Sequence, residues 1–77
     1  MTKEILIEQL NRKLELVRRA MNTWEDSADM AVTFYNQAFG MAEFACCLVQ
    51  DNPDLEKEIL ELWDNEYSAK FKEIIWG

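Results

Sequence analysis

A row of polar side chains spaced seven residues apart is the first feature of this 77-residue sequence that could do chemistry. Its members, which run through the most apolar part of the chain, are Asp29, Asn36, Glu43 and Gln50. Positions seven apart lie on one side of an α-helix about 10.5 Å apart, too far for these side chains to share one ion. The row therefore predicts a solvated face, in preference to a ligand groove or a close-packing seam at which Gly40 admits a neighbouring backbone.

The second chemical feature is the adjacent pair Cys46 and Cys47, in a chain that has no histidine. Redox pairs space their cysteines so that they can bridge, and a catalytic thiolate needs a nearby base or cation, which the neighbouring sequence lacks. We therefore expect two buried, reduced thiols in a cytoplasmic protein. Without histidine the chain can form neither a Ser/His/Asp triad nor a Cys/His zinc site, so we expect no cofactor and no metal.

Carboxylates are the third chemical resource, because fifteen Asp and Glu outweigh eight Lys and Arg and give a net charge of −7. Their clusters contain neither the Glu-x-x-His pattern of di-iron bundles nor an EF-hand loop. The negative charge also disfavours direct binding of nucleic acid, which requires Lys and Arg to neutralise phosphates. We predict an acidic surface at Asp51, Asp54, Glu58, Glu61 and Asp64.

Aromatic side chains form the fourth group, with three Trp, two Tyr and four Phe in a short chain. This number exceeds what the core of so small a helical domain readily hides, and large exposed apolar patches mark association sites. Val32 and Phe39 lie away from the main apolar stripe and are the leading candidates for such a patch. The predicted interface comprises Trp24, Val32, Tyr35, Phe39, Trp63, Tyr67 and Trp76.

Helices must position these side chains, since two glycines and one proline are too few for a many-stranded fold. Apolar residues at alternating spacings of three and four predict the first helix, and the sequence D-N-P-D separates the second from the third, with Asn52 as N-cap and Pro53 as first helical residue. The predicted fold class is all-α, a single domain spanning 1–77. We expect a three-helix antiparallel bundle with helices at about 3–21, 24–50 and 53–75.

Two features of the helices are left open by the sequence. The apolar stripe continues in phase from Ile7 to Val49, which would fit one helix over residues 3–50, but local capping signals favour a turn between residues 21 and 27. In the third helix the pair Asp64-Asn65 is the weakest point, and a kink is expected there.

A chain of this length buries only about 60% of the surface that its unfolded form exposes, so we expect oligomerisation to complete the bundle. The expected function is that of a non-enzymatic homodimer acting by protein–protein interaction, as an adaptor or inhibitor in bacterial or phage regulation. One alternative is an acidic mimic of nucleic acid that blocks a DNA- or RNA-binding protein, and another is a small-ligand or metal-binding bundle. Neither a signal peptide nor a membrane span is expected.

Overall fold

The computed structural model describes residues 3–23 and 27–77, and all regular structure in this part of the chain is helical. The prediction of an all-α fold is therefore confirmed. The elements are α1 (Lys3–Thr23), α2 (Ser27–Leu48), α3 (Pro53–Leu62), a π-helical turn η1 (Trp63–Tyr67) and α4 (Ser68–Trp76). No helix in the described ranges has both the length and the apolar composition needed to cross a membrane.

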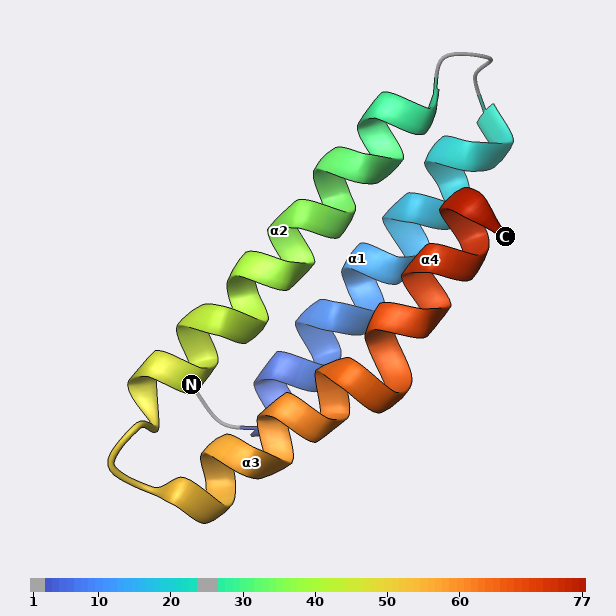
Figure 1. Cartoon of the computed structure of the whole chain (residues 1–77). Helices are drawn as coiled ribbons and strands as arrows, with labels where there is room; N and C mark the ends of the chain where they lie inside the picture. Colours follow the sequence, from blue (N-terminus) through green and yellow to red (C-terminus); the bar gives the residue numbers. More distant parts are fainter. Residues whose placement is uncertain (1–2, 24–26) are drawn as a thin grey trace.

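The chain reverses direction twice and builds an elongated molecule of 44 × 20 × 16 Å. Figure 1 shows α2 returning alongside α1, and the run α3, η1 and α4 then returning along both, so that α1 lies behind the space between the other two. This reversal contradicts the alternative of one continuous helix over residues 3–50, because α1 ends at Thr23 and α2 begins at Ser27. The predicted helix start at residue 24 lies outside the described residues.

The turn between α2 and α3 follows the predicted capping chemistry. The Asn52 side chain accepts a hydrogen bond from the Leu55 backbone N–H at 3.3 Å, and Pro53 is the first residue of α3. Proline is well placed there because a first-turn N–H has no helical partner. The second helix ends at Leu48, two residues before the predicted end at residue 50. In the turn that follows, the Asn52 N–H donates a hydrogen bond to the Val49 carbonyl.

Side chains of very different size fill the core. The buried residues of α2 are alanines, at positions 31, 38, 42 and 45, and these small side chains allow the close contact of α2 with α1. The third helical run supplies the large side chains, and its buried members recur every four residues as Ile59, Trp63, Tyr67 and Phe71. α1 completes the core with Leu6, Leu10, Leu14, Val17 and Ala20.

The π turn explains how a spacing of four keeps these residues on one face. In an α-helix, side chains four apart drift by about 40° per step, so Ile59 and Phe71 would diverge by about 120°. In η1 the Ser68 N–H bonds to the Trp63 carbonyl five residues earlier, so this turn contains one extra residue. The extra residue offsets about 100° of this 120° rotation, so that Ile59 and Phe71 stay on one face. The kink expected at Asp64-Asn65 is thus a local change of helix type at the same place.

A side-chain hydrogen bond fixes the π turn against α1. The Tyr67 hydroxyl donates to Asn11 Oδ1 at 2.7 Å. Burial raises the pKa of Tyr67 above its usual value, the charge of Glu66 adds to this, and the bond to Asn11 opposes it. Tyr67 therefore stays protonated at neutral pH and remains available as the donor.

Candidate functional site

The polar row on α2 faces solvent. Asp29, Asn36 and Glu43 are exposed on α2, away from its buried alanines, and Gln50 is exposed in the turn that follows the helix. A Cβ placed on Gly40 would meet no atom within 4 Å. The structure thus favours the solvated-face interpretation for Asp29 and Asn36, and no neighbouring helix approaches Gly40 closely.

Replacing Gly40 with alanine is expected to raise the free energy of unfolding by about 0.5 to 1 kcal/mol, because glycine costs that much in a helix interior. The added methyl group has open space, so no clash offsets the gain. Urea denaturation followed by circular dichroism measures the change. A loss of stability at high protein concentration only would instead place Gly40 in a contact between copies.

The two cysteines differ in their surroundings. Cys46 is half-buried and Cys47 is exposed, so the expectation of two buried thiols is wrong for Cys47 and holds only in part for Cys46. The reason is its place on the solvent side of α2, in line with the polar row. Burial raises the pKa of the Cys46 thiol above its ordinary value of 9.0, and the charges that add to this shift belong to Glu56, Cys47, Asp64 and Glu43.

Alkylation will reveal this raised pKa. In a Cys47→Ser variant, the rate of reaction of Cys46 with iodoacetamide is expected to reach half its maximum at a higher pH in the folded chain than in the unfolded chain, because only the thiolate reacts and burial with nearby acids disfavours it. The same variant unfolded in urea provides the control, in which the Cys46 thiol should have the ordinary pKa of a free cysteine. A native midpoint at or below the unfolded one would contradict the prediction.

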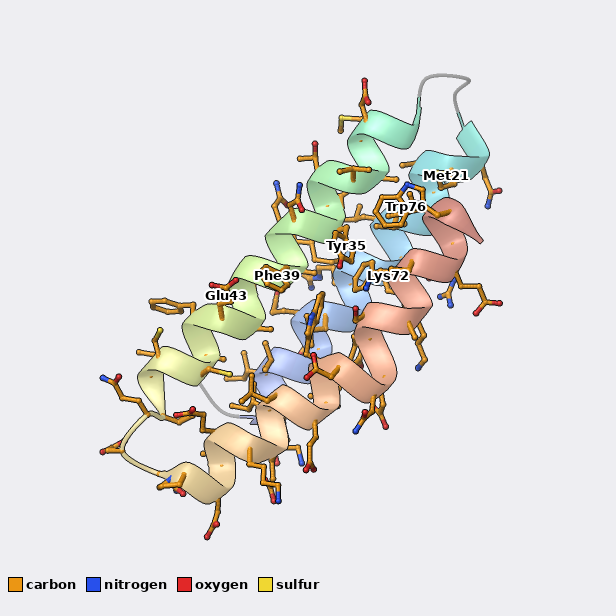
Figure 2. All side chains as sticks on the ribbon, viewed as in Figure 1. Met21, Tyr35, Phe39, Glu43, Lys72 and Trp76 are labelled. Carbon is orange, nitrogen blue, oxygen red and sulfur yellow. The ribbon has the colours of Figure 1, made fainter. Side chains whose placement is uncertain are left out.

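Aromatic rings line the boundary between α2 and the third helical run, and we call this set the aromatic seam. It consists of Tyr35, Phe39, Trp63, Phe71 and Trp76, whose ring centroids lie 5.7 to 5.9 Å apart in five pairs. Figure 2 shows Tyr35 and Phe39 one turn apart on α2, with Tyr35 facing Trp76 near the end of α4. Such tilted and edge-on pairs add attraction beyond the area that they bury.

One end of the aromatic seam opens into a groove between α2 and α3, of about 360 Å³, which we call the α2–α3 groove. Phe39 and Leu60 stand on its two sides, 43% and 46% exposed, and the buried ring of Trp63 lies beneath Phe39 at 5.7 Å. Its apolar lining is completed by Ala42, Cys46 and Ile59, and its polar lining consists of Glu43, Cys47 and Asp64. An apolar hollow with a few polar groups at its edge is the usual form of a binding site.

The predicted interface residues are divided between surface and core. Phe39 and Trp76 are exposed, and Val32 and Tyr35 are half-buried. Trp63 and Tyr67 belong to the core instead, because the π turn keeps them in line with the other buried residues of the third helical run. Trp24 lies outside the described residues.

Several exposed apolar residues were absent from the sequence prediction. Leu60 is the most important, because it forms one side of the α2–α3 groove. It precedes the half-buried Leu62 and the buried Trp63 closely enough in sequence to be read as core, and only its position in α3 distinguishes it. A second exposed group, away from the groove lining, comprises Ile5, Phe44 and Leu48.

The predicted acidic residues are all exposed but do not form one surface. Asp64 lines the α2–α3 groove, whereas Glu58 and Glu61 line a shallower hollow on the other side of α3. Glu58 Oε2 lies 3.7 Å from Lys3 Nζ, and Glu61 Oε1 lies 3.9 Å from Lys57 Nζ. No group of three metal-ligating side chains occurs within residues 3–23 and 27–77.

Comparison of the chain with models of protein families, with curated proteins and with solved structures gave no match.

Proposed function

We propose that this chain is a non-enzymatic protein-interaction domain, an adaptor or inhibitor, that binds a partner protein through the α2–α3 groove. The observation that carries the proposal is the groove itself, where Phe39 and Leu60 expose apolar surface over the buried ring of Trp63. Burying such surface is favourable by about 25 cal/mol per Å². Aromatic anchors around a preformed hollow are typical of the residues that dominate protein interfaces.

We further propose that the antiparallel three-helix bundle associates with a second copy through a different face. Phe44 and Leu48 lie one turn apart on α2 and are 58% and 49% exposed. The end of α2 that carries them lies beside the beginning of α1, where Ile5 is also exposed (Figure 1). A small domain gains stability by covering such residues.

A matched pair of leucine variants tests the two faces separately. Leu60→Gln changes the groove and Leu48→Gln changes the other face, and the two side chains are almost equally exposed. With the protein immobilised and a lysate of its native cells applied, we expect Leu60→Gln to lose the captured partner and Leu48→Gln to retain it. In sedimentation, Leu48→Gln should become monomeric while Leu60→Gln keeps the mass of the unmodified chain.

The outcome that contradicts the groove as binding site is the capture of the same proteins, in the same amounts, by the unmodified chain and by Leu60→Gln. A monomeric mass of the unmodified chain across micromolar concentrations would contradict self-association. Circular dichroism should give the same spectrum for all three proteins, since both leucines are exposed.

The acidic mimic of nucleic acid is a second candidate, and the observation that favours it is the exposure of all five predicted acids. Its partner would be held by charge, so capture should fall steeply with salt and should be insensitive to Leu60→Gln. A partner retained at high salt favours the apolar groove instead. The separation of these acids over two sides of α3 supports the groove as the leading proposal.

A further inference from the structure

The charged groups that surround the α2–α3 groove all have the same sign. Of the nine residues that line it, Glu43 on α2 and Asp64 on η1 are the two charged ones, and neither Lys nor Arg is among them. Glu56 on α3 also lies close enough to act on the Cys46 thiol inside the groove. Lys57, on the same helix, is not among the lining residues, and its Nζ lies 3.9 Å from Glu61 Oε1. The groove therefore has an apolar floor and an acidic edge on both walls.

We infer that the occupant of this groove is an amphipathic α-helix of the partner protein, with apolar side chains toward Phe39 and Leu60 and with Lys or Arg beside them. This inference rests on the proposed function and adds the chemistry of the partner. Basic side chains flanking the apolar anchors would meet Glu43 and Asp64, and such complementarity raises both specificity and the rate of encounter. Long Lys and Arg side chains can also lay their aliphatic stems along the apolar walls.

The dimensions of the groove fit a helix. Its residues on α2 run from Phe39 to Cys47, about 12 Å or two helical turns, so that anchors three, four and seven residues apart can enter it. The two walls are helices, and the described residues contain no strand edge to which an extended peptide could add. A helix in a groove is thus the mode of peptide recognition that this surface offers.

A second copy of the chain is the less favourable occupant. In a two-fold contact across the groove, Glu43 and Asp64 would face the same carboxylates of the other copy. Like charges brought together across an interface cost free energy, and here the carboxylates lie at the edge of the groove itself. A basic partner helix replaces this repulsion by attraction.

The test uses two synthetic helices of about fourteen residues, or four turns, with identical leucine faces. One carries Lys at its polar positions and the other carries Glu. We expect the unmodified chain to bind the Leu/Lys peptide, measured by fluorescence anisotropy, and to bind the Leu/Glu peptide at least about tenfold more weakly.

Charge reversal locates the binding. The double variant Glu43→Lys and Asp64→Lys should lose about tenfold in affinity for the Leu/Lys peptide and gain affinity for the Leu/Glu peptide. The control double variant Glu8→Lys and Glu73→Lys changes the net charge equally at exposed positions outside the groove, and it should change either affinity by less than about twofold. If the first variant fails to fold, the neutral pair Glu43→Gln and Asp64→Asn takes its place.

Three results would overturn the inference. The first is equal affinity for the two peptides, and the second is an equal loss of Leu/Lys binding in both double variants, which would indicate attraction to the total charge alone. The third is conversion of a dimer into a monomer by Leu60→Gln, which would make a second copy the occupant. If the peptides show no preference but Leu60→Gln still abolishes partner capture, this inference fails and the proposed function stands.

Discussion

Phe71→Ala is expected to lower the free energy of unfolding by about 3 to 5 kcal/mol, because deletion of a large buried ring forfeits its transfer free energy and leaves a cavity. Phe71 is 0% exposed, and its ring lies 5.8 Å from that of Tyr35 and 5.9 Å from that of Trp63. At about 0.05 to 0.15 kcal/mol per residue, a chain of this length is stable by only about 4 to 12 kcal/mol. Urea denaturation followed by circular dichroism should therefore show unfolding at a much lower urea concentration than in the unmodified chain.

Phe44→Ala is the matched control, since it makes the same chemical change at a ring that is 58% exposed. Its effect on the isolated chain should stay within about 0.5 kcal/mol, as for other surface substitutions. Equal losses in the two variants would contradict the assignment of Phe71 to the core and Phe44 to the surface. A loss in Phe44→Ala that grows with protein concentration would support Phe44 as part of the contact between copies.

Ala38→Leu is expected to have the second largest effect, a loss of about 1 to 3 kcal/mol or more. Ala38 is fully buried among the alanines of α2, where the close contact of α2 with α1 leaves little space for added methyl groups. The larger side chain must push α1 and α2 apart or adopt a strained rotamer. Thermal denaturation measures the loss, and a lowered midpoint with an unchanged helical spectrum at low temperature is the expected pattern.

Ala69→Leu on α4 provides the comparison for Ala38→Leu, because Ala69 is exposed. Leucine and alanine differ little in helix propensity, so the change should stay within about 0.5 kcal/mol. If Ala38→Leu proved as harmless as Ala69→Leu, the contact between α1 and α2 would have to be looser than the burial of its alanines indicates.

Most of the fold could be predicted from the sequence because its signals are local. The spacing of Leu10, Leu14 and Val17 on one helix face, and the capping by Asn52 and Pro53, each depend on residues within two turns of one another. The position of the π turn could not be predicted from such local signals, since its extra residue is accommodated by packing against α1 and α2. The spacing of four from Ile59 to Phe71 is the signal in the sequence that could have indicated it.

The candidate site was predictable only in part, because the sequence of α2 is apolar in almost every helical phase. Such a helix does not reveal which of its faces meets a neighbour and which remains exposed. Phe39 was identified as a surface ring and is one. Trp63 could not be separated from the surface residues by type, and Leu60 could not be separated from the core residues, since the position of α3 relative to α2 decides both.

The π turn has a further consequence for how the length of this chain can vary. Its extra residue lies between Trp63 and Tyr67, and losing one residue there would close the turn to an ordinary helical ring. Ile59, Trp63, Tyr67 and Phe71 would still share one face, because the shorter spacing removes the drift that the π turn now corrects. A homologous chain can therefore carry a single-residue deletion in the middle of its last helix and keep the same core.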